Sequence, residues 1–594
     1  MENLNEVLRE RCRIDASKHA FLVKRNGNWN PVTWREVDEK VDKIAAGLLS
    51  LGLRNGDSVS ILGNTRLEWT LTDLGALRIG CVSVGIYQTL SGEQSTYILK
   101  DSGSKVLFAE NMEQVNKISP YLEELPLLKK IVVWDGNKEG DHVLALDELI
   151  QTGEEQLANE RDILNDAEKK INPEDTAIII YTSGTTGPPK GACLSHANIL
   201  AQMKSIGSVV EEELLGDVMM FFLPLSHVGE RVPGQFFRIY KGITGAYVND
   251  ITQILDDIKD IRPAFFGSVP RIFEKAYAKI MSEVENAPPL KKRLFFWADG
   301  IGRDVSKKKQ KGETPGPVLS LKYAVADKLV FSKIRDIFGG RCRHFLSASA
   351  PIALEILEFF HACGMLILEG YGQTEVSCFC TLCSIDDYCF GSVGKPIPGA
   401  SIKVAEDGEI LVKGDIVFKG YLNQPELNRE TLTDDGWIYT GDVGRIDKNG
   451  FLWITGRKKE IIITSAGKNI TPSNIENILK NDPLIEHVML HGDKRKYATA
   501  LISLEPDNLK IWAEKEGHGA MGYEELVSLP ALKERVQASV DRTNRQVARF
   551  ETIKKFALLP KPLEVETGEL TPTMKVKRKI VETKYLHLLD ELYE

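Results

Sequence analysis

Short apolar runs alternate with stretches of helical periodicity over the first three quarters of the chain. Runs rich in β-branched residues predict buried strands, at residues 57–62, 105–108, 131–134 and 177–181. Between them, residues 34–51 and 67–80 carry apolar positions at helical spacing. This alternation is typical of α/β layers built on largely parallel sheets, so we expect that fold class.

The pattern changes between about residues 391 and 456, where strand and turn signals become dense. The pairs Asp407-Gly408, Asp435-Gly436 and Asn449-Gly450 favour hairpin turns. We therefore predict a small antiparallel β subdomain in this region.

Beyond the β subdomain a second α/β-type segment begins. A helix is expected at residues 471–480, and strands are expected at 487–490 and 499–504. Glycine and a run of charges at 456–459 indicate an exposed connection. The predicted domains are a large N-terminal domain, 1–456, and a smaller mobile C-terminal domain, 457–594.

Composition places the chain among ordinary globular proteins. Its 594 residues are 43% hydrophobic and 27% charged, which excludes a disordered or fibrous protein. A formal net charge of −9 provides no global attraction for nucleic acid, so no nucleic-acid partner is expected. The N-terminus has no secretory pattern, and nine irregularly spaced cysteines fit reduced thiols, so we expect a cytoplasmic location.

Four of these cysteines crowd a short stretch, at Cys378, Cys380, Cys383 and Cys389. A zinc site is one interpretation, but the spacing lacks paired CxxC knuckles. Thr, Phe and Tyr between the thiols indicate strand. We favour buried thiols that pack as small hydrophobic groups.

A basic stretch beside aromatic residues occupies residues 286–314. Such a segment can lie on an anionic membrane, so peripheral membrane contact is one hypothesis. The alternative is a surface insertion whose aromatic side chains pack under the domain. We favour this alternative, because the charges flank the aromatic residues and do not interleave with them.

The strongest chemical signal is the loop TSGTTGPPKG, which directly follows the predicted strand 177–181. Small residues let several backbone N–H groups converge on one anion, and hydroxyls and a lysine add donors. The expected phosphate-binding residues are Thr182, Ser183, Gly184, Thr185, Thr186, Gly187 and Lys190. A Walker A loop opens a helix, whereas Pro188-Pro189 prevents a helix from starting there.

This loop resembles the phosphate loop of the adenylate-forming superfamily, which includes acyl-CoA synthetases, luciferases and adenylation domains. YGQTE at 371–375, YTGD at 439–442, GRKKE at 456–460 and Lys575 in TPTMKVKR follow in the order of that family. The resemblance covers nearly the whole chain. It implies ATP-dependent activation of a carboxylic acid, with Mg²⁺ as cofactor and CoA as the acyl acceptor.

Site residues follow from the resemblance one motif at a time. Tyr371 supplies a ring for adenine stacking, and the segment Ser349-Ala350-Pro351 packs on the other face of the base. Gly372, Gln373 and Thr374 complete the nucleotide motif. Glu375 and Thr182 are associated with the metal.

The later motifs imply the moving parts. Asp442 accepts the ribose hydroxyls, and Arg457 lies near ribose and phosphate. Lys575 stabilises the charge that develops on the α-phosphate during adenylation. Lys459 is the hinge about which the C-terminal domain rotates, and that rotation brings Gly467 and Lys468 to the CoA path.

The acid is expected to be a fatty one. Residues 221–231 (FFLPLSHVGER) and 268–275 resemble long-chain fatty acyl-CoA synthetases, which places His227 near the carboxylate. Phenylalanines at 221, 222, 236, 237, 265 and 266 offer apolar surface for an alkyl chain, or are ordinary core. The alternatives are a fatty acyl-AMP ligase that uses a carrier protein, a synthetase for another acid, and a non-catalytic ATP-binding or membrane-scaffold protein.

Overall fold

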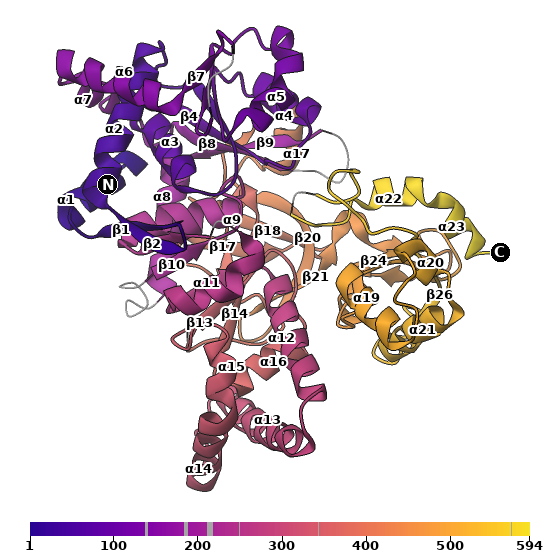
Figure 1. The fold of residues 1–594 in the computed structure, drawn as a ribbon. Helices are drawn as coiled ribbons and strands as arrows, with labels where there is room; N and C mark the ends of the chain where they lie inside the picture. Colours follow the sequence, from indigo (N-terminus) through magenta and orange to yellow (C-terminus); the bar gives the residue numbers. More distant parts are fainter. Residues whose placement is uncertain (137–139, 183–187, 211–217, 249, 343, 572) are drawn as a thin grey trace.

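The computed structural model describes residues 1–594 except 137–139, 183–187, 211–217, 249, 343 and 572. Most of the chain forms a large N-terminal domain, and the C-terminal segment forms a smaller lobe beside it (Figure 1). The large domain contains parallel-rich sheets with helices around them and one antiparallel sheet. The predicted α/β fold class is confirmed.

An eight-stranded sheet forms the frame of the N-terminal part. Its order is β19-β9-β8-β4-β3-β5-β6-β7, and the strands from β8 to β7 are parallel. The strands are β3 (Ser58–Leu62), β4 (Val82–Ile86), β5 (Val106–Ala109), β6 (Lys130–Val133), β7 (Val143–Ala145), β8 (Thr176–Thr182), β9 (Lys190–Ser195) and β19 (Gly420–Tyr421). All four strands predicted from the apolar runs are therefore present.

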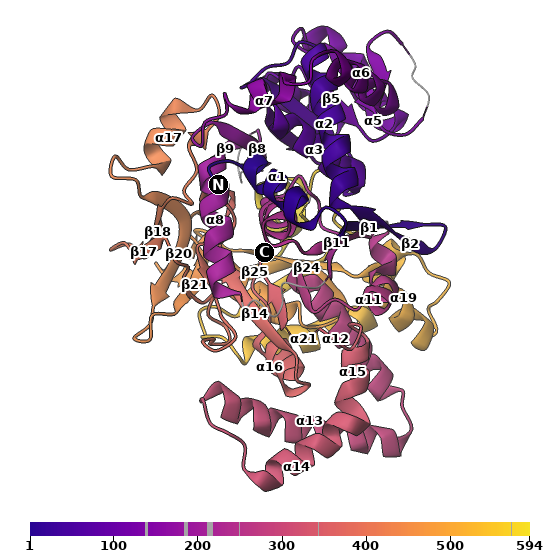
Figure 2. The same cartoon turned by 90° about the vertical axis from the view of Figure 1, so that its left-hand side faces the viewer.

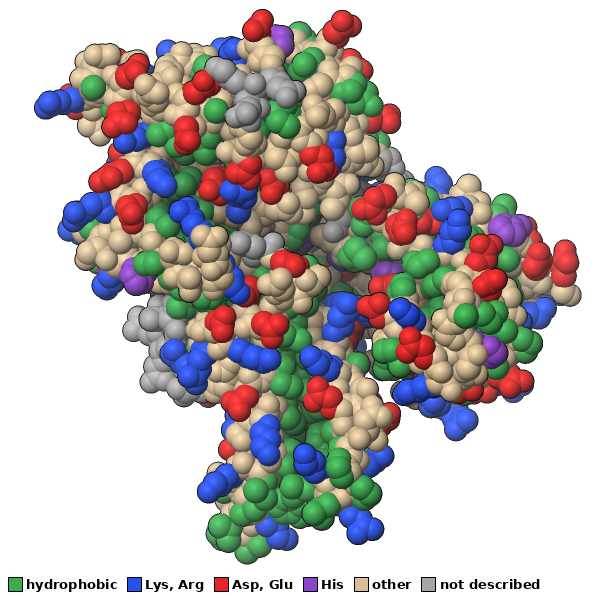
Figure 3. Space-filling model, viewed as in Figure 1, with side chains coloured by type: hydrophobic (Ala, Val, Ile, Leu, Met, Phe, Trp, Pro, Cys, Tyr) green, Lys and Arg blue, Asp and Glu red, His purple; other side chains and the backbone are tan. Residues whose placement is uncertain are grey.

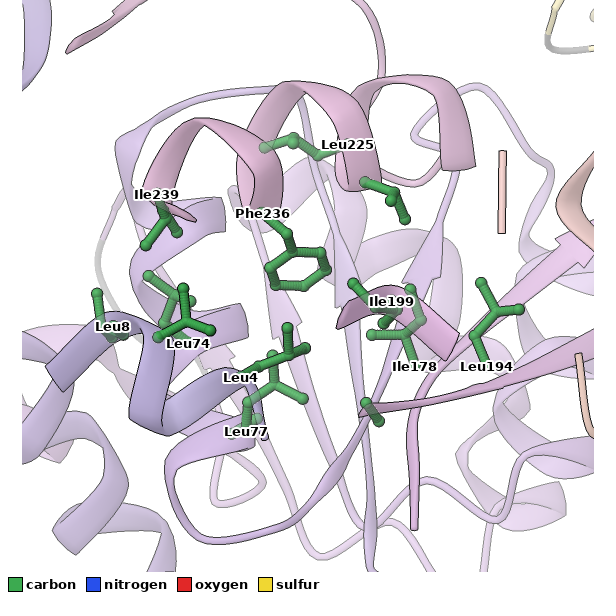
Figure 4. Packing of buried hydrophobic residues seen from close by; sticks show 14 of the residues in the cluster. Leu4, Leu8, Leu74, Leu77, Ile178, Leu194, Ile199, Leu225, Phe236 and Ile239 are labelled. Carbon is green, nitrogen blue, oxygen red and sulfur yellow. The ribbon is translucent and has the colours of Figure 1, made fainter. Parts of the chain in front are cut away.

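Helices cover both faces of this sheet. Side chains point alternately to the two faces along each strand, and the central strands carry apolar residues on both faces. Ile178 and Ile180 pack with α2 (Trp34–Ser50), α3 (Leu67–Arg78) and α8 (His196–Val209), as Figure 4 shows for part of this core. Ile179 and Tyr181 pack on the opposite side, with α4 (Gly92–Asp101) and α5 (Met112–Ile118). Thr33 and Glu36 form a capping box that begins α2 at its predicted position.

The N-terminal domain contains two further sheets with parallel pairings. One has the order β12-β13-β14-β15-β16, and the other has the order β10-β11-β1-β2. Their strands are β12 (Phe265–Ser268), β13 (His344–Ser347), β14 (Leu366–Tyr371), β15 (Thr381–Leu382), β16 (Lys395–Pro396), β10 (Val218–Phe221), β11 (Thr244–Tyr247), β1 (His19–Arg25) and β2 (Asn28–Thr33). Other helices of this domain include α1 (Leu4–Asp15), α6 (Leu146–Asn159), α11 (Ile254–Ile261), α12 (Pro270–Glu285) and α16 (Leu354–Ala362).

The dense turn region forms a four-stranded antiparallel sheet of order β17-β18-β20-β21. Its strands are β17 (Ala400–Val404), β18 (Glu409–Gly414), β20 (Ile438–Ile446) and β21 (Leu452–Arg457). Asp407-Gly408 joins β17 to β18, and Asn449-Gly450 joins β20 to β21. Asp435-Gly436 lies in the turn between Leu432 and Ile438, which form an antiparallel bridge, so all three turns are where the sequence predicts them.

The C-terminal lobe follows β21 after a short 3-10 turn, Lys458–Glu460. Its sheet of order β24-β25-β26 has one antiparallel and one parallel pairing. The elements are β22 (Ile462–Ile463), β23 (Asn469–Ile470), α18 (Pro472–Leu479), β24 (Ile485–His491), β25 (Ala498–Leu504), α19 (Pro506–Lys515), α20 (Tyr523–Val527), α21 (Pro530–Asn544), β26 (Ile553–Leu558), α22 (Arg578–Lys584) and α23 (Leu586–Glu591). The predicted helix and two strands of this lobe are all found.

Residues 286–314 differ from the interpretation favoured on sequence. They contain one long helix, α13 (Pro289–Gln310), which lies beside α14 (Pro317–Ala326) in an arm that projects from the domain (Figures 1 and 2). Phe295 is buried as expected, but Phe296 and Trp297 are exposed. Packing of the aromatic side chains under the domain is therefore correct for Phe295 and wrong for its two neighbours, because only one face of α13 meets α16.

Candidate active site

A large cleft of about 2650 Å³ is lined by residues of both the N-terminal domain and the C-terminal lobe. Most residues predicted for the site line this cleft, although they come from segments spread over nearly 400 positions. They are Thr182, Lys190, His227, Ser349, Ala350, Pro351, Tyr371, Gly372, Gln373, Thr374, Glu375, Asp442, Arg457, Lys459 and Lys575. Ser183, Gly184, Thr185, Thr186 and Gly187 lie outside the described residues.

Tyr371, Asp442 and Arg457 form one hydrogen-bonded group. The Tyr371 hydroxyl donates to Asp442 Oδ2 at 2.7 Å, and Arg457 Nε lies 3.1 Å from Asp442 Oδ1. Asp442 and Arg457 face each other directly across β20 and β21, which explains the contact. Burial raises the pKa of Asp442, and Arg457 and the Tyr371 hydrogen bond oppose that rise. The pairing therefore favours an ionised acceptor within the cleft.

The Tyr371 motif follows the carboxyl end of β14 and turns sharply. A Cβ placed on Gly372 would lie 1.7 Å from the carbonyl oxygen of Cys378, so only glycine fits at that position. The short 3-10 turn that follows, Thr374–Val376, carries Glu375. The glycine thus allows the ring of Tyr371 and the carboxylate of Glu375 to line the same cleft.

Thr182 and Lys190 are held together by the β8–β9 hairpin. They are register partners, and the Thr182 hydroxyl is 3.5 Å from the Lys190 carbonyl oxygen. Lys190 begins a strand and not a helix, as the two prolines predict. The hairpin therefore brings both ends of the phosphate loop to one edge of the cleft.

Sequence reasoning missed Tyr421, which connects the hairpin to Glu375. Its hydroxyl donates to Glu375 Oε1 at 2.6 Å, and the Lys190 ammonium lies 5.6 Å from its ring centroid. Tyr421 is in β19, which pairs with β9. The pairing of a two-residue strand with a segment more than 200 positions away has no signal in local periodicity, so only the fold reveals this residue.

Oxygen atoms of Glu375 and Thr182 suit a magnesium ion, because Mg²⁺ prefers carboxylate, hydroxyl and phosphate oxygens. Tyr421 occupies one oxygen of the Glu375 carboxylate and holds its orientation. Among the described residues no group of three or more His, Cys, Asp or Glu side chains is arranged to hold a metal ion by itself. A metal at this position would therefore complete its coordination with water and with phosphate oxygens of the nucleotide.

Ser349, Ala350 and Pro351 form an exposed loop after β13 and line the cleft with Tyr371. Ser349 has a φ of 74°, a left-handed conformation that is uncommon for a residue with a side chain. Such strain occurs at ligand-binding loops more often than elsewhere. This loop and the ring of Tyr371 are suited to hold a planar base.

Lys575 enters the cleft from a turn of the C-terminal lobe. Thr571 N–H donates to the Lys575 carbonyl oxygen at 2.8 Å, and Lys575 N–H donates to Thr571 Oγ1 at 3.0 Å. Desolvation by the surrounding protein and repulsion by Arg457 lower the pKa of Lys575, while Asp442 and Glu460 oppose that change. The Lys575 side chain is nevertheless exposed, because it projects into the open cleft.

His227 caps the short helix α9 (Val228–Glu230) and faces the same space. Its Nδ1 accepts from the Gly229 N–H at 3.0 Å. Burial, with a smaller contribution from the Lys575 charge, lowers the pKa of His227 to about 4. The imidazole is therefore neutral near pH 7, and it lies close enough to Lys575 for the lysine charge to disfavour its protonation.

Apolar side chains line part of the cleft. Four of the six phenylalanines singled out on sequence line it, at positions 222, 237, 265 and 266. Phe221 and Phe236 pack in the core without lining the cleft, and Phe221 stacks there on Tyr247. Phe222, Phe237 and Phe266 line the cleft and are buried members of core clusters as well. These side chains give the cleft apolar surface suited to an alkyl chain. The two expectations for the phenylalanines, pocket and core, both hold at positions 222, 237 and 266.

The residues predicted for the hinge and for the CoA path differ in their position relative to the cleft. Lys459 is in the exposed turn Lys458–Glu460, which connects the two domains. Gly467 and Lys468 are on the exposed β22–β23 hairpin and do not line the cleft. In this orientation Lys575 occupies the site, so a role for Gly467 and Lys468 requires the domain rotation and stays a prediction.

The crowded cysteines have no metal-binding arrangement. Cys378, Cys380 and Cys383 are buried, Cys389 is half-buried, and all four are free thiols. Burial raises the pKa of each thiol, which disfavours the thiolate that a metal needs. Packing as small hydrophobic groups agrees with the structure.

Comparison with known proteins connects this geometry to a family. Residues 8–422 match the AMP-binding enzyme family, and residues 459–594 match the AMP-binding enzyme C-terminal domain. The long-chain-fatty-acid–CoA ligase FadD15 of Mycobacterium bovis is 37% identical, over all of this chain and 97% of the relative. The long-chain-fatty-acid–CoA ligase ACSBG2 of Xenopus laevis is 33% identical, over 97% of this chain and 81% of the relative.

Solved structures share the fold. The anthranilate CoA ligase AuaEII, in complex with anthranoyl-AMP, superposes with a TM-score of 0.73 at 20% identity and covers 99% of this chain and 98% of its own. A fatty acyl CoA synthetase of Mycobacterium tuberculosis has a TM-score of 0.63 at 21% identity, with 98% of each chain covered. At these identities the similarity shows the fold.

Proposed function

The chain belongs to the AMP-binding enzyme family, and we propose that it is a long-chain fatty acid–CoA ligase that forms AMP. One observation carries the proposal. The hydrogen-bonded group of Tyr371, Asp442 and Arg457, the basic residue Lys575 and several apolar side chains all line one cleft. The names of the full-length relatives support a fatty acid as the substrate.

In the first step, a carboxylate oxygen of the fatty acid attacks the α-phosphorus of ATP. A P–O bond forms, and the bond to the departing pyrophosphate breaks. Lys575 stabilises the negative charge that develops on the phosphoryl oxygens, while neutral His227 orients the carboxylate without adding charge. Asp442 holds the ribose, and Thr182 and Glu375 would hold Mg²⁺, which neutralises phosphate charge when bound.

In the second step, the CoA thiolate attacks the carbonyl carbon of the acyl-AMP. A C–S bond forms and the C–O bond to AMP breaks, so AMP leaves with the electron pair. Lys575 has no role in that displacement. Rotation about Lys459 would withdraw it and bring the hairpin with Gly467 and Lys468 to the carbonyl group. Exposure of this hairpin in the present orientation supports such an exchange.

The surroundings of the enzyme are also part of the proposal. In the part of the chain that the structure describes, no helix is long and apolar enough to cross a membrane. We propose a cytoplasmic location, which nine free cysteines support. Peripheral membrane contact through residues 286–314 is proposed as well, because α13 carries exposed apolar and basic side chains there.

A panel of acids tests the substrate and the acceptor together. Saturated acids of six to twenty-four carbons and benzoate are supplied with ATP and Mg²⁺, with and without CoA, and AMP and thioester are measured. Long-chain acids are expected to release AMP and form thioester only when CoA is present. Use of benzoate but not alkyl acids would overturn the fatty-acid assignment. Pyrophosphate exchange without thioester would favour a ligase that serves a carrier protein.

A further inference from the structure

A rigid arm, residues 289–331, projects from the N-terminal domain away from the eight-stranded sheet (Figures 1 and 2). It consists of α13, α14 and the π-helical turn Asp327–Phe331. The inner face of α13 packs on α16, where a Cβ on Gly302 would lie 2.7 Å from the Ala362 carbonyl oxygen. Phe295 and Phe359 have ring centroids 6.3 Å apart at this contact. The arm is thus anchored along one side only.

An apolar stripe on the arm faces solvent. Val318, Leu321, Val325 and Leu329 recur at spacings of three and four residues, so they share one face of α14 and the turn that continues it. Val318 and Leu321 are 68% and 69% exposed. A surface helix normally turns its apolar face to the core. The reverse orientation here leaves a connected apolar surface that the described chain does not cover.

Other apolar side chains of the arm are exposed on α13. Leu290 is 79% exposed, and Trp297, two turns further along, lies on the same face of that helix. Phe296 is also exposed. Exposed tryptophan and phenylalanine suit the boundary between lipid headgroups and acyl chains, where an aromatic ring meets both environments.

Positive charge surrounds the stripe. Residues 289–331 hold ten Lys and Arg against four Asp and Glu, a net charge of +6 in a chain whose formal net charge is −9. Within the described residues, salt bridges of the arm's basic side chains involve only Arg303 and Lys308. Lys322 and Lys328 are exposed beside the stripe. Figure 3 shows hydrophobic and basic side chains together at the lower end of the arm.

We propose that this arm docks on a membrane that contains anionic phospholipid, with the α14 stripe in the interface and the lysines at the headgroups. Exposed apolar residues beside unpaired lysines are complementary to such a surface. The net charge of +6 on the arm complements anionic headgroups, and the exposed Phe296 and Trp297 suit the headgroup boundary, which together favour a lipid surface over a protein. The proposal deepens the membrane contact suggested for 286–314, because the stripe lies on α14, outside that segment. The docking proposal rests on the proposed function in one respect. A fatty acid, the proposed substrate, partitions into bilayers, so a membrane would be its source.

Flotation of the full chain with vesicles tests the docking. Vesicles of phosphatidylcholine alone are compared with vesicles that also contain phosphatidylglycerol. We expect the wild type to float with the anionic vesicles and to dissociate as salt is raised. The double variant Lys322→Gln with Lys328→Gln should lower the vesicle partition coefficient by roughly 30-fold. Each lysine near an anionic surface raises that coefficient about fivefold. Leu321→Gln with Val325→Gln should weaken it at least about tenfold.

Matched controls separate this effect from general changes in charge or hydrophobicity. Lys510→Gln with Lys533→Gln, and Ile511→Gln, alter exposed residues of the C-terminal lobe and should leave vesicle binding unchanged. All variants should make acyl-CoA at the wild-type rate from detergent-dispersed acid. Failure of that reaction in the wild type would count against the proposed function and not against docking.

Three results would overturn the docking proposal. The first is a wild type that does not bind anionic vesicles. The second is binding that the arm variants leave unchanged. The third is concentration-dependent dimerisation in analytical ultracentrifugation that the arm variants abolish, which would assign the stripe to a second copy of the chain.

Discussion

An ion pair across the cleft holds the C-terminal lobe in the orientation that places Lys575 in the site. Arg271 at the start of α12 lies 3.3 Å from Glu486 Oε1 in β24. The two side chains belong to different domains, so the proposed rotation about the Lys459 turn would separate them. Arg271→Gln or Glu486→Gln should therefore disfavour the present orientation relative to the rotated one.

The size of the effect follows from the burial of the pair. Two charges about 4 Å apart attract by about 4 kcal/mol at an effective dielectric constant of 20. The side chains are 35% and 18% exposed, and burial raises the pKa of Glu486 despite Arg271, so desolvation offsets much of this attraction. A partly exposed pair is worth about 1 kcal/mol or less. The population ratio of the two orientations should change by up to about fivefold.

Separate assays of the half-reactions measure this change. ATP–pyrophosphate exchange follows adenylation, and thioester formation from supplied acyl-AMP and CoA follows the second step. Each single variant should slow exchange by about two- to fivefold while the second step is maintained or faster. The exchanged pair Arg271→Glu with Glu486→Arg should restore the ratio of the two rates, and Arg549→Gln, at an exposed position of the lobe, should have no effect.

The reasoning is refuted if both half-reactions fall equally in the single variants. It is also refuted if the exchanged pair is as impaired as either single change. Either result would mean that Arg271 acts on the substrate pocket that it lines and not through Glu486.

Two further predictions concern buried carboxyl groups. Asp442→Asn removes the charged acceptor that Tyr371 and Arg457 share. The Kd for ATP, measured by calorimetry, should rise by about 10- to 100-fold. An unchanged Kd would exclude a contact between Asp442 and the ribose. Burial raises the pKa of Glu369 to about 8, although the Gly391 N–H donates to it. Because the folded state then holds a proton that the unfolded chain loses above its ordinary pKa of 4.5, stability falls as pH rises from about 4.5 to 8. Between pH 5.5 and 8, the free energy of unfolding of the wild type, measured by thermal melting, should fall by a few kcal/mol relative to that of Glu369→Gln. Parallel pH profiles of the two proteins would contradict this prediction.

Local patterns were sufficient for the secondary structure around the site. Residues 177–181 are apolar and β-branched, and they form β8 in the centre of a sheet that is buried on both faces. The two Asx-Gly pairs at 407 and 449 form tight hairpins, because their φ values near 85° suit glycine. Motif resemblance supplied the site residues, and the cleft contains all of those described except Gly467 and Lys468.

Contacts between distant segments were not predictable in the same way. Tyr421 supports Glu375 only because β19 pairs with β9, and that pairing is a property of the whole sheet. The exposed face of α14 was missed for a related reason. Its periodicity marks an amphipathic helix, but periodicity alone does not say whether the apolar face meets the core or solvent.

The most direct test of the account is the effect of Lys575→Gln on the two half-reactions. Loss of a preorganised charge at the α-phosphate should slow acyl-AMP formation by about 10²- to 10³-fold. Thioester formation from supplied acyl-AMP and CoA should remain within a fewfold of wild type, and Lys579→Gln in the same basic run should leave both steps intact. Equal loss of both steps, or adenylation that survives in Lys575→Gln, would contradict a site in which Lys575 serves the first step alone.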